Sequence, residues 1–202
     1  MTQNKPIARD LVERRRAVVV AGHRGDPAPA IAALNDPDPV MREVALGALR
    51  RLDALGADTL TTMISDTDRN VRRRVAELSA TVQDVDLTPL INDDDPMVVE
   101  MAIWACGEHE TVTDDVLRRI IDLTTSADDP LVREAGAAAL GAIGDERGLE
   151  AILAACTDKP AVRRRAVLAL APFEGERVDE AIDAALADRD WQVRQSAEDL
   201  RR

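Results

Sequence analysis

The residues with the greatest capacity for chemistry in this chain are arginines and aspartates that recur at fixed spacings. An aspartate lies six residues before an arginine in three places, and four residues before one in four places. A guanidinium can bind a carboxylate or a phosphate through two parallel hydrogen bonds, so these arginines could form internal ion pairs or contact an acidic ligand. The arginines are Arg42, Arg72, Arg133, Arg163 and Arg194, the aspartates at six residues are Asp36, Asp66 and Asp188, and those at four are Asp38, Asp68, Asp129 and Asp190.

Arginine triplets at residues 14–16, 72–74 and 163–165 provide a second source of positive charge. They indicate either a solvated face paired with neighbouring acids or a basic patch for an acidic or phosphate-bearing partner, and we favour the first. The chain as a whole has 26 Lys plus Arg against 38 Asp plus Glu, a formal net charge of -12, which repels phosphate backbones on average. Side chains for base stacking are also scarce, with two Trp, one Phe and no Tyr. The sequence therefore disfavours nucleic acid as a partner.

No set of residues indicates a catalytic, cofactor or metal site. The chain has two histidines and two cysteines, and these are too few and too scattered to supply the ligands that a metal ion needs. A phosphate-binding G-x-x-x-x-G-K loop and a G-x-S-x-G nucleophile turn are both missing from the sequence. We therefore predict a non-enzymatic protein without a cofactor.

The elements that must position these side chains are repeated units. One fingerprint occurs six times, and its clearest copy is DDPLVREAGAAALGAIG at residues 128–144. A period near thirty residues indicates stacked supersecondary units that cannot bury their apolar faces alone. Such an array presents a long surface rather than a pocket, which favours binding over catalysis. The first buried position of each copy is Met41, Val71, Val98, Val132, Val162 and Val193.

Each unit is expected to contain two helices. In the fourth unit, apolar residues recur at helical spacing over residues 113–127, and an Asp-Asp-Pro break precedes a second helix that ends at Gly144. An aspartate before proline suits a helix N-terminus, and proline suits the first turn. We therefore predict an all-α fold of about six helical pairs in a single domain, 1–202. Residues 1–26 form an N-terminal capping helix and loop, and residues 27–202 form the repeats.

The phrase D-P-x-V-R-x-x-A-x-x-A-L-G, which residues 129–141 carry most fully, resembles HEAT repeats, in particular the short bacterial PBS-lyase-type kind. The resemblance covers the chain from about Pro29 onward and implies a right-handed α-solenoid whose second helices line a concave face. Most HEAT proteins are scaffolds that hold protein partners along that face, a minority bind nucleic acid, and some subfamilies catalyse reactions. The chain departs from the pattern at Val99, where an arginine is expected, and at Asp68-Arg69, where the proline is missing.

The resemblance also implies a structural role for the repeated charges, as an Asp–Arg ladder that ties the turns between helices together. A ligand role for the arginines is the alternative. The ladder residues are Asp36, Arg42, Asp66, Arg72, Asp129, Arg133, Arg163, Asp188 and Arg194.

Candidate partner-binding residues lie two positions after the first buried residue of each copy, where every copy is polar. Trp104 lies four residues further along the third copy, at a position where other copies hold Glu77 and Asp199. It is either an exposed anchor for a partner or a space-filling contact with a neighbouring helix. The candidates are Glu43, Arg73, Glu100, Trp104, Glu134 and Arg164.

These observations predict a non-catalytic HEAT-repeat adaptor that binds a protein or peptide along its concave face, as a monomer or weak homo-oligomer. The first alternative is a DNA-repair protein resembling HEAT-like alkylpurine glycosylases, which would need Arg73, Arg74, Arg164 and Arg165 to converge. The second is a bilin-lyase-like chaperone for a chromophore, which the repeat type alone suggests. The apolar stretch AVVVAG is too short for a signal peptide or a membrane span, so a cytoplasmic location without membrane contact is expected.

Overall fold

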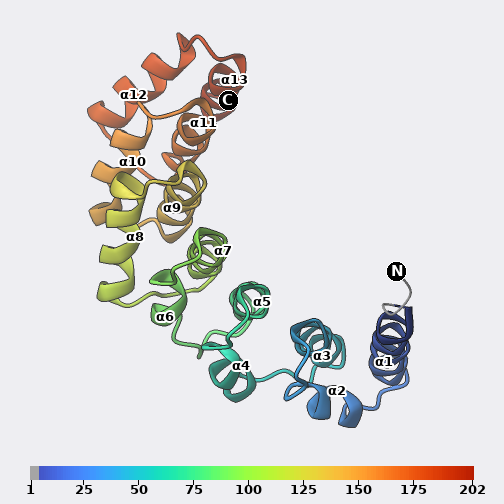
Figure 1. The fold of residues 1–202 in the computed structure, drawn as a ribbon. Coiled ribbons are helices and arrows are strands. Elements are labelled where there is room, and N and C mark those ends of the chain that lie inside the picture. The colour runs from blue at the N-terminus through green and yellow to red at the C-terminus, as the bar shows by residue number, and fades with distance from the viewer. Residues whose placement is uncertain (1–4) are drawn as a thin grey trace. The chain divides into compact units, whose positions relative to one another are not determined.

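The computed structural model describes residues 5–202, with side chains from Asp10 onward, and this part of the chain is helical without any strand (Figure 1). The chain groups into two compact units, Met1–Val85 and Asp86–Arg202, called here the N-terminal and C-terminal units. The prediction of an all-α fold of stacked helical pairs is confirmed. Organisation as a single domain, 1–202, stays a prediction, and residues 1–4 of the expected capping segment lie outside the described residues.

The N-terminal unit contains two helical pairs, α2–α3 and α4–α5, and a longer first helix. That first helix packs against α3 in the same way as α3 packs against α5, so it takes the place of a second helix. The helices are α1 (Lys5–His23), α2 (Ala28–Ala33), α3 (Pro39–Arg51), α4 (Ala57–Met63) and α5 (Arg69–Ser79).

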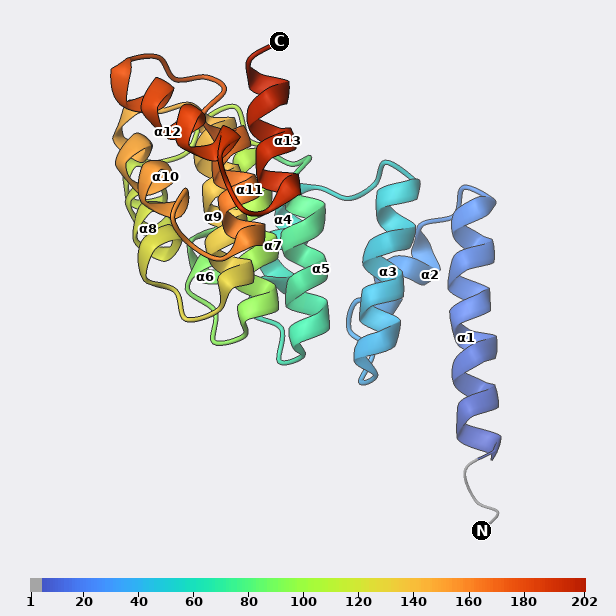
Figure 2. The ribbon, with the colours of Figure 1, turned by 90° about the horizontal axis from the view of Figure 1, so that it is seen from above.

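The C-terminal unit contains four helical pairs, in which α7, α9, α11 and α13 are the second helices. These pack side by side in that order, with a first helix against each (Figure 2). The elements are α6 (Thr88–Ile91), α7 (Pro96–Gly107), α8 (Asp114–Ser126), α9 (Pro130–Ile143), the 3₁₀ turn η1 (Glu146–Gly148), α10 (Leu149–Ala155), α11 (Pro160–Ala169), α12 (Glu176–Leu186) and α13 (Trp191–Leu200).

Local sequence explains why the second helices begin and end where they do. The Asp129 carboxylate accepts a hydrogen bond of 2.9 Å from the Leu131 backbone N–H, and Pro130 occupies the first turn of α9. Asp38, Asp68, Asp95 and Asp190 cap α3, α5, α7 and α13 in the same way. At its other end α9 stops at Gly144, which adopts the left-handed conformation with φ 67°.

Small residues let the second helices of the C-terminal unit approach closely. A Cβ added to Gly141 of α9 would lie 2.6 Å from Cα of Ala169 on α11, closer than real contacts allow. A Cβ on Gly107 of α7 would lie 3.1 Å from Cα of Ala139 on α9. The backbones therefore pack against one another with little side-chain volume between them, which matches a core poor in aromatic residues.

Candidate binding groove on the second helices

Three arginines join neighbouring helical pairs through bidentate ion pairs. Nε and Nη2 of Arg42, Arg133 and Arg163 donate to the carboxylate oxygens of Asp66, Asp158 and Asp188, at 2.6 to 2.8 Å. The aspartate lies 24 or 25 residues after its arginine, in the turn before the next second helix. The remaining nitrogen, Nη1, donates to backbone oxygens of the turn that precedes its own helix: Asp36, Ala127 and Asp158 are the acceptors for Arg42, Arg133 and Arg163.

The other members of the predicted ladder have different bonds. Nη1 of Arg72 and of Arg194 donates to the backbone oxygens of Asp66 and Asp188, within the same turn. Asp129 caps α9, as described above. The carboxylate of Asp36 accepts from Arg14 of α1.

Sequence reasoning missed two members of this set, Arg14 and Asp158. Arg14 belongs to the first arginine triplet, which has no Asp six residues before it. Asp158 lies five residues before Arg163 rather than six, so it falls outside the spacing used to find the others. A search for arginines 22 to 25 residues before an aspartate would have found both pairs.

These hydrogen bonds shift the acidity of the aspartates. The Arg133 guanidinium is the main reason that the pKa of Asp158 lies below its usual value, and Arg163 acts in the same way on the pKa of Asp188. Burial of Asp66 opposes its ionisation, but the hydrogen bonds from Arg42 and from the Asp68 backbone together outweigh it and lower its pKa. The carboxylates are therefore held ionised and occupied within the protein.

One junction of the C-terminal unit lacks this ion pair. On α7 the arginine position is Val99, which is buried, and the aspartate position in the turn before α9 is Ala127. Both partners are missing together, so neither leaves an unpaired charge behind. The α7–α9 junction is held instead by apolar packing between the helices.

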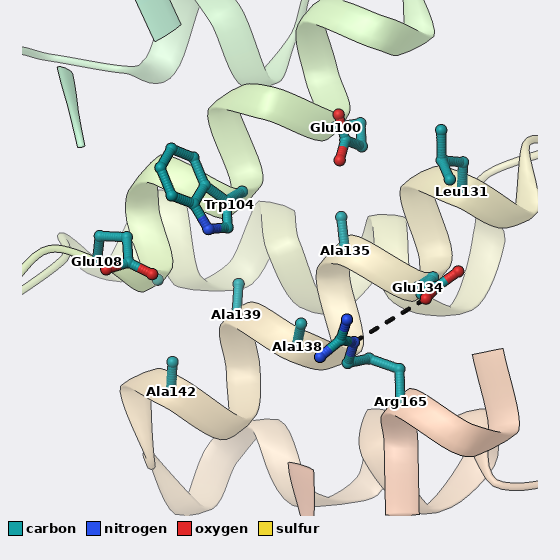
Figure 3. A pocket seen from close by; sticks show the side chains of 11 residues that line it. Glu100, Trp104, Glu108, Leu131, Glu134, Ala135, Ala138, Ala139, Ala142 and Arg165 are labelled. Carbon is teal, nitrogen blue, oxygen red and sulfur yellow. Dashed lines mark ion pairs between the residues drawn. The ribbon is translucent and has the colours of Figure 1, made fainter. Parts of the chain in front are cut away.

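A groove lies on the exposed side of this junction, between α7, α9 and α11 (Figure 3). Its volume is about 370 Å³, and alanines of α9 form its floor. The lining residues are Glu100, Trp104, Gly107, Glu108, Leu131, Glu134, Ala135, Ala138, Ala139, Ala142 and Arg165.

The α7 wall of the groove carries an indole between two carboxylates. Glu100, Trp104 and Glu108 are spaced by four residues and therefore share one face of the helix, as Figure 3 shows. Trp104 is 41% exposed. A large aromatic side chain this accessible is a candidate contact for a partner.

The opposite wall carries charges of both signs. Glu134 of α9 lies 3.6 Å from Arg164 Nη2 and 3.9 Å from Arg165 Nε, both on α11 (Figure 3 marks the second pair). These arginines are therefore partly neutralised by a carboxylate within their own unit. In the N-terminal unit, Arg74 forms an ion pair of 2.7 Å with Glu77.

The structure brings together half of the predicted partner-binding residues. Glu100, Trp104 and Glu134 line the groove, and Arg164 pairs with Glu134 beside it. Glu43 is exposed on α3, and Arg73 is half-buried on α5 with an Nε that has no hydrogen-bond partner among the described residues. These two belong to the N-terminal unit and are not part of the groove.

Exposed apolar side chains show that the groove is part of a wider surface. Within residues 86–202, all of which are described, the large apolar side chains that remain exposed lie on second helices and never on first helices. They are Met97 and Trp104 of α7, Leu131 of α9, Leu168 of α11 and Trp191 of α13. We call this surface the second-helix face.

The histidines and cysteines do not gather into a site. Among the described residues, no three His, Cys, Asp or Glu side chains are grouped so that they could hold a metal ion. Burial raises the pKa of the Cys106 thiol to about 12 and that of Cys156 to about 11, which keeps both protonated and unreactive at neutral pH. None of the helices described here is long and apolar enough to cross a membrane.

Stacked helical pairs with an exposed row of second helices define an α-solenoid repeat protein. The family model for HEAT repeats matches residues 57–138, 85–171 and 117–201, which together span 57–201. The chain therefore belongs to the HEAT-repeat family.

Solved structures with the same fold are designed proteins. Two engineered proteins are each 18% identical to this chain, with TM-scores of 0.65 and 0.59; the alignments cover 87% and 84% of this chain, and 96% and 92% of theirs. A designed armadillo repeat protein in complex with the peptide (KR)4 is 15% identical with a TM-score of 0.62, over 86% of this chain and 97% of that one. No curated protein matches the sequence.

Proposed function

We propose that the protein is a non-catalytic adaptor that holds a protein or peptide partner on the second-helix face of its C-terminal unit. The observation that carries this proposal is the restriction of exposed large apolar side chains in that unit to the second helices. Exposed apolar side chains that cluster on one face mark interaction surfaces, because leaving them in water has a cost that a partner removes. A groove beside Trp104 gives this face an indentation into which a side chain of the partner can fit.

Two further points support a protein partner over a nucleic acid. The net charge of -12 opposes a polyanion, and three of the four arginines that a nucleic-acid site would need have a carboxylate beside them. The designed armadillo repeat protein with this fold was solved with a peptide, so an array of helical pairs can serve as a peptide-binding surface.

The test is a pull-down from the native-host lysate with the whole chain as bait, after nuclease treatment. We expect a protein partner that is retained by the wild type and lost with the double variant Leu131→Glu/Leu168→Glu. Ile31→Glu is the matched control, because Ile31 is also exposed but lies on α2 of the N-terminal unit. Thermal unfolding of all three baits checks that each is folded. A partner that disappears with nuclease, or one that is equally well retained by the Leu131→Glu/Leu168→Glu bait, would overturn the proposal.

A further inference from the structure

The groove beside Trp104 has a chemical polarity that narrows its occupant further than the proposed function does. Its α7 wall places the indole of Trp104 between the carboxylates of Glu100 and Glu108, one helical turn away on each side (Figure 3). Glu108 is exposed and has no ion-pair partner among the described residues. An aromatic face flanked by carboxylates attracts a cation, through the ring quadrupole and through charge.

The floor of the groove requires something different from its occupant. It consists of Ala135, Ala138, Ala139 and Ala142 of α9, which offer methyl groups and no hydrogen-bonding side chain. This surface suits an aliphatic chain. Arginine and lysine side chains combine an aliphatic stem with a cationic head, so one such side chain can satisfy the floor and the α7 wall together.

The α11 wall disfavours an anionic occupant. Arg165 faces the groove, but its Nε lies 3.9 Å from Glu134, which also attracts Arg164. A phosphate or carboxylate placed there would have to compete with Glu134 and would face Glu100 and Glu108 across the groove. The charges that line the groove therefore favour a cation.

We propose that the groove binds a protein segment through an arginine or lysine, whose head contacts the Trp104 indole between Glu100 and Glu108. The stem of that side chain, or an aliphatic neighbour, lies on the alanines of α9. This inference rests on the proposed function, because it names the chemistry of the partner that the second-helix face holds. The occupied volume of about 370 Å³ suits one or two side chains rather than a folded domain, so the segment inserts side chains and lies across the face.

The experiment is selection of a displayed library of random 12-residue peptides on the immobilised full chain. An enriched sequence is then synthesised with a fluorescent label and measured by anisotropy, next to a copy in which each Arg and Lys is replaced by Gln. We expect enriched peptides to carry Arg or Lys within two residues of an aliphatic side chain, and the Gln copy to bind at least tenfold more weakly.

Variants of the protein locate the binding. Trp104→Leu keeps apolar bulk but removes the aromatic face, and Glu100→Gln/Glu108→Gln removes two charges. Each should weaken binding about tenfold, since cation–π and charged contacts of this kind contribute on that scale. Glu176→Gln/Glu180→Gln on α12 is the control, because it changes charge equally on a first helix and should leave affinity unchanged.

The outcomes separate the inference from the proposed function. Enriched peptides without Arg or Lys that lose affinity with Trp104→Leu but not with Glu100→Gln/Glu108→Gln would overturn the inference and leave the proposed function standing. If no peptide is enriched above background, or if affinity is indifferent to every groove variant, both the inference and the location of the proposed binding surface fail.

Discussion

Arg163 is the side chain of this protein with the most hydrogen bonds to lose. It is 7% exposed, it donates two hydrogen bonds to Asp188, and it donates a third to the backbone oxygen of Asp158. Arg163→Ala would leave the half-buried Asp188 carboxylate without its partner, and we expect a loss of about 3 kcal/mol in the free energy of unfolding. Urea unfolding followed by circular dichroism measures it.

Arg177→Ala is the matched control, because Arg177 also pairs with a carboxylate in the next first helix. Its partner Glu150 and Arg177 itself are exposed, so water replaces the lost contact and the change should be much smaller. Equal losses in the two variants would show that the Arg163 pair is no more than a surface ion pair.

Acid should weaken the protein through the same aspartates. The pKa values of Asp36, Asp66, Asp158 and Asp188 lie below normal in the folded state, and an unfolded Asp titrates near about 3.9. Their stabilising contribution is therefore complete above about pH 4 and is lost as pH falls below that value toward the folded pKa. We expect the melting temperature to decline between about pH 4 and pH 2. Arg133→Gln, which removes the main cause of the low pKa of Asp158, should decline less over that range; an equal decline would contradict this account.

At the scale of helices, the sequence predicts where second helices begin because the signal is local. An aspartate and a proline act on the N–H groups of the same turn, so the capping by Asp38 and Asp129 follows from adjacent residues. The ion pairs behave differently. Asp36 and Arg42 look like partners six residues apart, yet Arg42 reaches Asp66 of the next turn, and Asp36 accepts from Arg14. Which turn faces which guanidinium is decided by stacking, which a spacing within one turn does not contain.

The groove was foreseen in part for the same reason. Glu100, Trp104 and Glu134 stood out because they broke the pattern of their copies or stayed polar in it. The alanine floor of α9 and Glu108 did not stand out, because alanine is common in every copy and Glu108 lies at the end of its helix. Their role appears only when α7 and α9 are placed side by side.

The α7–α9 junction offers a direct test of what the ion pairs contribute to helix stacking. Val99→Arg alone puts a charge in a buried position, and Ala127→Asp alone adds a carboxylate without a partner, so both should destabilise. The double variant should rebuild the missing pair, with a coupling free energy of about 2 kcal/mol in a double-mutant cycle. Urea unfolding of the four proteins measures it. Additive effects would show that α7 and α9 cannot adopt the geometry that Arg163 and Asp188 adopt.

At the scale of the whole molecule, the dominant physical property is its charge of -12 at pH 7. Such an excess repels itself, and added salt screens repulsion between exposed charges more than attraction within half-buried ion pairs. Raising NaCl from 0.01 to 0.1 M shortens the screening length from about 30 Å to about 10 Å. We therefore expect the melting temperature at pH 7 to rise by a few degrees with salt, and to rise less near the isoelectric point of about 4.7.

The same screening should act with the opposite sign on the partner. A segment that inserts an arginine or lysine between Glu100 and Glu108 is attracted by the charge that destabilises the fold, so its affinity should fall over the salt range in which the melting temperature rises. Anisotropy of the selected peptide and thermal unfolding, measured in the same buffers, give both slopes. If affinity and melting temperature rise together, apolar contact with Trp104 and the α9 alanines, rather than charge, holds the segment. If the melting temperature falls with salt, the ion pairs between turns outweigh the repulsion of the whole chain.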